Sequence, residues 1–495
     1  MIRRCACLLL ATSLLAAPQA RPKPAAVLQP GSSPLVTLRM VFMTGAADDP
    51  PGKEGLAALT AAMLAGGGTR TMSYDRIVEA MYPMAASVEW QIDKEMTVLA
   101  GTTHAETLDK YYALFKDMLL DPGFRADDFK RLQDAATNFL KVDLRQSNDE
   151  ELGKEYLYNI LYAGHPYAHH NMGKVTSVQK LTLQDVREFY RAHYTQANLV
   201  IGVAGGYPQN FGQKVETDFG KLPAGNGGKK RIGAPKLSAG LHVEIVERDT
   251  RSTAISMGFP IEINRSSVDW PALSVAVSYL GQHRSPNSHL YQQLREARGL
   301  NYGDYAYIEY FPRGMYRFTP DPNLARQQQI FQIWIRPVEP RNGMFALRAA
   351  LYEFEKMVRD GLSKENFEGA RDFLIKYSNI LTQTQDLRLG YALDSRYYGI
   401  PDFTTYMRDR LSRLTLDDVN RAIKRYLAPD RMRIVMITKD GATLRDALMN
   451  NAPSPIQYNS PKPEEIVEED KTIQSYRINI KPSDVVLVPI EKVFQ

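Results

Sequence analysis

The sequence predicts an α+β fold of two homologous halves, each a mixed, mainly antiparallel sheet packed with helices. The strongest observation is a repeat. LTLQDV from Leu181 and LTLDDV from Leu414 each open an amphipathic helix pattern, followed by the apolar strand patterns NLVIGVAGG and RIVMITKDG. A second pair, DPGFRADDF around Gly123 and RDGLSKENF around Gly361, is offset by 238 residues against 233 for the first. A near-constant offset is typical of a duplicated domain.

Each half begins with strand patterns and continues into helices. LVTLRMVFMTG from Leu35 and TAISMGFPIEI from Thr253 are apolar, alternating segments that favour strands. The segment ETLDKYYALFKDML instead has helical spacing, and its apolar stripe would pack on a sheet. That stripe comprises Leu108, Tyr111, Leu114, Phe115 and Met118.

Composition changes along the 495 residues suggest where the parts of the chain begin and end. LPAGNGGKKRIGAPKLSAG is rich in Gly, Pro and Lys and is typical of a linker. Near the end, prolines and acidic residues precede the apolar RINIKPSDVVLVPIEKVF, whose strand would dock on this chain or on a partner. We expect a signal peptide at 1–20, an N-terminal peptidase-like domain at 21–222, a linker at 223–240, a C-terminal domain at 241–447 and an extended tail at 448–495.

The first twenty residues, MIRRCACLLLATSLLAAPQA, have the pattern of a secretory signal. Arg3 and Arg4 precede a short apolar run and small residues. The run is too short for an ordinary membrane helix, and a mitochondrial presequence would be richer in Arg and Ser. Both cysteines, Cys5 and Cys7, lie inside this segment, so the mature chain would have no disulfide and no thiol ligand. We expect a periplasmic or secreted protein without stable membrane insertion.

The overall composition excludes some classes of partner. A hydrophobic fraction of 44% with 24% charged residues is that of an ordinary globular protein. The formal charge of +5 is too small to indicate a nucleic-acid partner. The basic run Lys229, Lys230 and Arg231 falls in the Gly-rich stretch and fits a solvated linker.

Three motifs resemble the bacterial insulinase/pitrilysin-family proteins over nearly the whole mature chain. They are GAADDPPGKEGLA near the start, GHPY at 164–167 and LREARGLNYG at 294–303. The resemblance implies two α+β halves that form half of a clam-shell. In the family, G-L-A in the first half is followed by the zinc motif H-x-x-E-H, and a more distant Glu is the third ligand.

This chain departs from the family at every zinc-ligand position. Its helix reads GLAALTAAMLAGGG, with Ala58, Ala61 and Ala62 at the motif positions. Thr137 and Asn138 fall at the third-ligand position. Zinc needs imidazoles one turn apart and a carboxylate base for the bound water, and a methyl group can neither coordinate nor move a proton. We therefore expect no metal cofactor in this chain.

The second half keeps two residues to which the resemblance gives a catalytic and substrate-binding role, Arg295 and Tyr302. In the family such a pair, seven residues apart, reaches across the closed chamber to the substrate at the zinc. A guanidinium offers a planar fork to a peptide carbonyl or carboxylate, and a phenol can donate to a developing oxyanion. On spacing alone, a solvated Arg295 at a helix end and a Tyr302 that starts a strand remain the alternative.

Other polar clusters have simpler explanations. His165, His169 and His170 could form a displaced metal site, but Pro166 interrupts any helix there and a structural loop is favoured. The acidic run at 149–151 suits the positive end of a helix dipole. The glycines at 66–68 would end the preceding helix, and the tyrosines at 302, 305, 307 and 310 fall on an expected strand with mainly packing roles.

These observations favour the non-zinc, substrate-binding subunit of a two-chain zinc metallopeptidase that degrades short or unfolded peptides. The expected partner is a homologous subunit with intact H-x-x-E-H that carries the zinc, and this chain would be inactive alone. The alternative is a catalytically inactive structural or peptide-binding protein of the same fold. An enzyme with some other metal site is the least supported, because the sequence offers no second ligand set.

Overall fold

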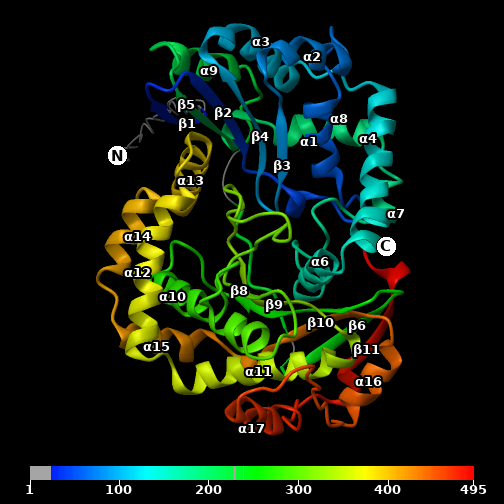
Figure 1. Cartoon of the computed structure of the whole chain (residues 1–495). Coiled ribbons are helices and arrows are strands. Elements are labelled where there is room, and N and C mark those ends of the chain that lie inside the picture. Colours follow the sequence, from blue (N-terminus) through cyan, green and yellow to red (C-terminus); the bar gives the residue numbers. More distant parts are fainter. Residues whose placement is uncertain (1–23, 227–229, 238) are drawn as a thin grey trace, which may run out of the picture.

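The computed structural model describes residues 24–226, 230–237 and 239–495, so the expected signal peptide lies outside the described residues. Two sheets form the centres of two lobes, drawn one above the other in Figure 1. Helices cover both sheets, which confirms the predicted fold of two mixed α/β halves. No helix in the described part of the chain is long and apolar enough to cross a membrane.

The first sheet has five strands in the order β1-β5-β2-β4-β3. β1 pairs parallel with β5, and the other pairings are antiparallel. Strand β3 lies at one edge of this sheet. The strands are β1 (Ala25–Pro30), β2 (Leu35–Phe42), β3 (Glu89–Ile92), β4 (Thr97–His104) and β5 (Leu199–Gly205).

Nine α-helices belong to the described part of the first half, and the expected apolar stripe of α3 packs into the core of this half. The expected helix signals are present: α8 begins at a capping box of Thr182 and Asp185, and α1 ends at Gly66. The helices are α1 (Leu56–Gly66), α2 (Tyr74–Met81), α3 (Leu108–Leu120), α4 (Ala126–Asn138), α5 (Arg145–Ser147), α6 (Asp149–Leu161), α7 (Val175–Val178), α8 (Leu183–His193) and α9 (Phe211–Phe219).

The second sheet repeats this plan with one more strand, in the order β11-β6-β10-β7-β9-β8. β6 pairs parallel with β10, as β1 does with β5, and β8 is the edge strand that corresponds to β3. The strands are β6 (His242–Glu247), β7 (Thr253–Ile261), β8 (Asp304–Tyr307), β9 (Gln329–Val338), β10 (Arg433–Thr438) and β11 (Val485–Pro489).

The helices of the second half follow the same order of packing. α10 lies against the edge strand β8, α12 and α15, as α1 lies against β3, α4 and α8. Thr415 and Asp418 form the second capping box, at the start of α15. The helices are α10 (Trp270–Gly281), α11 (Gly343–Asp360), α12 (Lys364–Leu381), α13 (Gln385–Tyr398), α14 (Phe403–Leu411), α15 (Leu416–Tyr426), α16 (Gly441–Met449) and α17 (Glu464–Ile473).

The two halves exchange one helix each. α6 of the first half packs on β7 and β10 of the second sheet, and α13 of the second half packs on β5, β1 and β2 of the first (Figure 1). Small residues permit the close approach: a Cβ at Gly153 of α6 would lie 3.2 Å from Ser256 Oγ, and one at Gly202 of β5 would lie 3.0 Å from Leu393 Cδ1 of α13. Each half therefore covers a face of the other's sheet, which fixes the two lobes together.

The segment after residue 448 is not extended throughout, in contrast to the expectation from its prolines. The ten-residue helix α17 forms within it, because EEIVEEDKTI buries Ile473 and Asp470 on one side. The last strand, β11, pairs parallel with β6 of this chain's own second sheet. Of the two possibilities that the sequence left open, the strand therefore docks on this chain and not on a partner.

Candidate functional site

The helix that would carry zinc ligands in an active relative is closed by packing. Ten of the eleven residues of α1 are buried, so the helix has no exposed face. Ala58 is 1% exposed, Ala61 0% and Ala62 6%. The buried Asp49 carboxylate accepts hydrogen bonds of 2.7 Å from the N–H groups of Gly55 and Ala57 and so caps the helix. Its role here is structural.

The third-ligand position is equally unsuited to a metal. Asn138 is the last residue of α4 and is exposed, while Thr137 is partly buried. On the same helix, the buried Gln133 amide donates to Val178 O at 2.8 Å and Leu181 O at 3.0 Å, so it is committed to the fold. Within the described ranges, no three His, Cys, Asp or Glu side chains are grouped as they would have to be to hold a metal ion.

The histidine cluster after α6 has separate partners. His169 Nε2 lies 3.0 Å from Asp49 Oδ2, whereas His165 Nε2 lies 2.9 Å from Gly233 O. His170 Nε2 lies 3.5 Å from Glu155 Oε2. Burial lowers the pKa of His170 to about 3 and raises the pKa of Glu155 to about 7. The His170 ring is therefore neutral at neutral pH, and these imidazoles do not converge on one point.

A cavity of about 380 Å³ lies between the two halves, beside β3 at the edge of the first sheet. Its walls come from the edge strand β3, the residues after α4, helix α6 and the long β8–β9 loop. Residues on these walls include Trp90, Gln91, Phe139, Glu151, Tyr310 and Tyr316. An edge strand beside a cavity of this size can accept an extended peptide.

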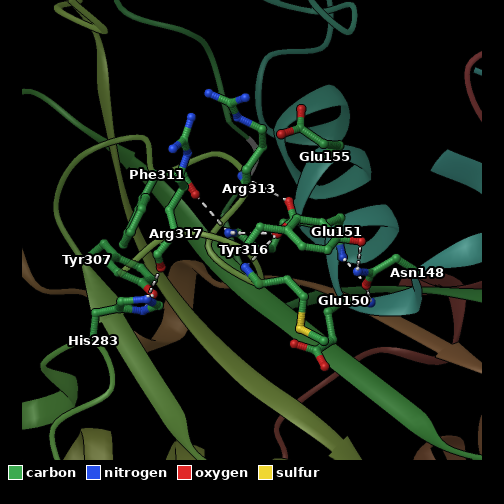
Figure 2. A network of polar contacts seen from close by, with 12 residues as sticks. Asn148, Glu150, Glu151, Glu155, His283, Tyr307, Phe311, Arg313, Tyr316 and Arg317 are labelled. Atoms are coloured by element: carbon green, nitrogen blue, oxygen red, sulfur yellow. Dashed lines mark hydrogen bonds and ion pairs between the residues drawn. The ribbon is translucent and has the colours of Figure 1, made fainter. Parts of the chain in front are cut away.

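The β8–β9 loop is fixed to α6 by polar contacts, which Figure 2 shows. Glu151 accepts hydrogen bonds from the backbone N–H groups of Arg313, at 3.2 Å, and Met315, at 3.0 Å. Lys154 Nζ donates to Phe311 O at 2.8 Å. The sequence indicated that the acidic run opens a helix, and it does, but the second role of Glu151 in holding this loop was missed.

The loop is also held from the side of the second sheet. His283 Nδ1 lies 2.7 Å from the Tyr307 hydroxyl and Nε2 lies 2.8 Å from Arg317 O (Figure 2). A carbonyl accepts, so Nε2 carries the proton and Nδ1 accepts from the phenol. Burial lowers the pKa of His283 to about 3, which keeps this tautomer neutral. The guanidinium groups of Arg313 and Arg317 extend from the loop and pair with Asp321.

Arg295 and Tyr302 lie on the surface of the second half. Tyr302 is 76% exposed and makes no hydrogen bond to any described residue. Arg295 belongs to a short π-helix, Tyr291–Glu296, where it pairs with Glu296 and stacks 4.9 Å from the Tyr291 ring centroid. Neither residue lines the cavity beside β3. The expected strand begins only at Asp304, so Tyr302 precedes it.

The segment between Arg295 and Tyr302 is anchored from the tail. Arg298 has a fully buried side chain whose guanidinium donates at 2.8 Å to both Asp470 and Glu469 of α17. The Asn301 amide donates to Asp304 Oδ1 at 2.7 Å at the other end. Sequence reasoning missed Arg298, although it lies within the LREARGLNYG motif, because its acidic partners are more than 170 residues away.

Comparison with known proteins places this geometry among peptidase relatives. The model described as insulinase, peptidase family M16, matches residues 26–174, and that of the peptidase M16 inactive domain matches residues 180–374. An uncharacterised zinc protease of Mycobacterium bovis is 25% identical over 252 residues, 49% of this chain and 55% of its own. The matched region is thus about half the length of that relative. The non-peptidase homolog YmxG of Helicobacter pylori is 21% identical over 79% of this chain and 86% of its own.

Solved structures show the same fold. A peptidase M16 inactive domain from Pseudomonas fluorescens superposes with a TM-score of 0.72 at 22% identity, over 84% of this chain and 95% of that one. The periplasmic protease PqqL of Escherichia coli superposes with a TM-score of 0.64 at 16% identity. That match covers 93% of this chain but 51% of PqqL, so the chain corresponds in extent to half of PqqL.

Proposed function

The chain belongs to the insulinase family, peptidase family M16, and we propose that it is the non-zinc, substrate-binding subunit of a heterodimeric zinc metallopeptidase. Its partner is a homologous chain with an intact H-x-x-E-H helix that carries the zinc. The substrates are short or unfolded peptides, and the compartment is the periplasm or the extracellular space. Alone, the chain is inactive.

The observation that carries this proposal is the exposure of Tyr302. A tyrosine that is 76% exposed, on a segment anchored by a buried ion-pair network, contributes little to the chain's own core. The phenol is therefore free to donate to an oxyanion in a second chain that closes over it. Arg295 lies one short segment away and adds a planar donor fork for the peptide.

The share of PqqL that this chain covers also supports a two-chain arrangement. The match covers 51% of PqqL, and the first half of PqqL by itself superposes on 91% of this chain. A partner of similar size would supply the second half of a clam-shell and the metal site that the alanines of α1 exclude. The alternative, an inactive structural or peptide-binding protein, is favoured by the H. pylori relative described as a non-peptidase homolog.

Co-expression with a zinc-bearing homologue from the same genome tests the proposal. Size exclusion with light scattering should give a one-to-one complex that buries more than ~1,000 Å² of surface. The complex should hydrolyse an unstructured fluorogenic peptide, whereas this chain alone should not. A partner that hydrolyses the peptide equally well without this chain, while this chain stays monomeric, would favour the alternative.

A further inference from the structure

The tail of the chain contacts the segment that presents Arg295 and Tyr302 to solvent. Helix α17 forms within this tail, whereas the two matched family regions end at residue 374. The helix packs on α11, on the side of the second half that faces away from the first (Figure 1). Its position far from the cavity between the halves excludes direct contact with a peptide there, so any role in the site must act through its contacts.

Arg298 is the point of contact between the segment and α17. Its side chain is fully buried. Nε donates to Asp470 Oδ1 and Nη2 donates to Glu469 Oε2, both at 2.8 Å, while Nη1 donates to Gln293 O at 2.9 Å. All three guanidinium nitrogens therefore have an acceptor, which fixes the plane of the guanidinium and, with it, the position of Arg298.

The two carboxylates that hold Arg298 have further partners. The Tyr458 hydroxyl donates to Asp470 Oδ2 at 2.5 Å. Lys356 Nζ, on α11, lies 3.5 Å from Glu469 Oε1. With this lysine, two positive and two negative charges form the network, so its formal charge is balanced.

The end of α17 is fixed to the core of the second half. Arg348, on α11, is 0% exposed, and its Nη1 donates to Gln474 O at 2.6 Å and to Ala452 O at 2.8 Å. Ile473, the last residue of α17, is also 0% exposed and belongs to the core of this half. The helix is thus a rigid support between that core and Arg298.

The backbone from Arg298 to Tyr302 is short and turns at Gly299. Gly299 has a φ of 69°, in the left-handed region, and its N–H donates to Arg295 O at 2.7 Å. Asn301 holds the other end of the turn through its hydrogen bond to the first residue of β8. Because the Tyr302 side chain is 76% exposed, little packing fixes it, and its place follows from these two anchors.

Stability alone does not account for a buried ion network of this kind. Removing Arg298 and Asp470 from water costs free energy, which their attraction offsets only in part. Apolar side chains of similar volume would often give equal or greater stability. Charge-assisted hydrogen bonds with this geometry do, however, select one arrangement of the segments that carry them.

We propose that α17 is a positioning element for the segment that presents Arg295 and Tyr302 to the partner chain. Arg298 is the positioning residue, and the carboxylates of Glu469 and Asp470 hold it. The inference rests on the proposed function, because it concerns the same two exposed side chains. It adds that the tail determines how they are presented, although Arg298 is buried and contacts no substrate.

Peptide turnover by the assembled pair tests this role. Arg298→Met keeps an unbranched side chain in the buried space and removes all three donor contacts. We expect kcat to fall ~10- to 100-fold and KM to rise, because a small displacement of positioned groups has effects of this size. A structural role alone would lower the amount of active pair and leave KM unchanged, so an unchanged KM would overturn the proposal.

A double-mutant cycle asks whether Arg298 acts through Tyr302. If it does, Arg298→Met should lower kcat strongly in the wild-type background and hardly at all in the Tyr302→Phe background. Equal losses in the two backgrounds would overturn the positioning role.

Two further variants control for folding. The single change leaves two carboxylates without their donor, which costs stability, so Arg298→Met is also combined with Glu469→Gln and Asp470→Asn to give a neutral network. This triple variant should have near wild-type melting temperature and heterodimer formation but the same loss in kcat. Glu468→Gln is the matched control on α17, because Glu468 pairs with Lys471 on the exposed face of the helix. A loss in Glu468→Gln equal to that of the triple variant would contradict the role of Arg298.

Hydrogen exchange on the chain without its partner separates this proposal from the proposed function. The amides of residues 299–303 should exchange about fivefold faster or more in the triple variant, the factor that one net hydrogen bond gives, while those of α11 stay protected. Unchanged exchange at 299–303 would overturn the coupling to the tail, whatever the pair does. Faster exchange together with wild-type turnover of Tyr302→Phe would support the coupling and overturn the proposed catalytic role of Tyr302.

Discussion

Helices α1 and α10 occupy corresponding positions in the two halves, but α1 is enclosed by its neighbours whereas α10 borders a cavity. Around α1 the ligand positions are alanines, and the helix is closed on all sides by neighbouring elements. Around α10 a cavity remains, and the segment that follows presents Arg295 and Tyr302 to solvent. At corresponding positions, one half of the fold is thus packed closed, whereas the other keeps a cavity and accessible polar groups.

The largest effect is expected from Tyr302→Phe in the assembled pair, which tests whether the accessible groups of the second half take part in peptide turnover. The change removes one hydroxyl and keeps the ring, and loss of an oxyanion donor costs ~10² to 10³ in kcat, or about 3 to 4 kcal/mol. Peptide turnover is the measurement, with melting temperature alongside. Tyr82→Phe, at an 84% exposed tyrosine of the first half, is the control and should behave as wild type. Equal turnover of both variants would make Tyr302 an ordinary surface residue.

The closed state of α1 is tested by Ala61→Glu, at a residue that is 0% exposed. A carboxylate forced into this core lacks space and partners, so we expect a loss of about 3 kcal/mol or more in the free energy of unfolding. Urea unfolding measures it. Ala135→Glu on the exposed face of α4 should change stability little.

Restoring the zinc motif also tests whether the packing around α1 excludes a metal site. The variant with Ala58→His, Ala61→Glu, Ala62→His and Asn138→Glu should be destabilised and should hold no stoichiometric zinc. A stable quadruple variant with one zinc per chain would contradict the account. It would show that the first half lacks only the ligand side chains and still has the space for a metal site.

Acid should lower the free energy of unfolding, because buried histidines stay neutral in the folded chain. His283 is the residue with which this effect is tested in the second half. Burial holds its pKa at about 3, whereas the unfolded chain takes up the proton below about pH 6.5. The unfolded state then binds more protons, so the free energy of unfolding falls as the pH drops through this window. His283→Gln keeps a donor and an acceptor without titrating and should remove about 2 kcal/mol of that fall between about pH 6.5 and 4.5. If the free energy of unfolding of the variant fell with pH as it does in the wild type, this assignment would be contradicted.

The smallest expected effect is that of Arg295→Lys. Lysine keeps the charge but loses the planar fork, so the KM of the pair should rise up to ~10-fold with little change in kcat. Arg359→Lys is the control, because Arg359 also pairs with its acidic sequence neighbour on the surface. A KM unchanged by Arg295→Lys would leave this residue without a role in substrate binding.

Local patterns predicted much of the fold. The helices that begin after Thr182 and Thr415, the strands β2 and β7 and the end of α1 at Gly66 follow from short-range rules of periodicity, alternation and glycine geometry. The repeat offset also correctly paired the two halves, because corresponding elements are spaced alike in the sequence.

Long-range packing was not predictable in the same way. The exchange of α6 and α13 depends on which sheet each amphipathic helix covers, and periodicity does not specify the partner. The tail helix α17 and its contacts with Arg298 join segments far apart in the chain. At the site, the missing ligands were visible from the motif, whereas the cavity beside α10 and the anchoring of the β8–β9 loop by Glu151 depend on three-dimensional contacts.

The central claim is that one peptidase site is divided between two chains. Titration of this chain into a fixed amount of the zinc-loaded partner, with peptide turnover and bound zinc measured at each step, tests it most directly. The account predicts that turnover rises and saturates at one chain per partner, while the zinc content stays that of the partner alone. Turnover independent of this chain, or zinc that increases in proportion to it, would contradict the account.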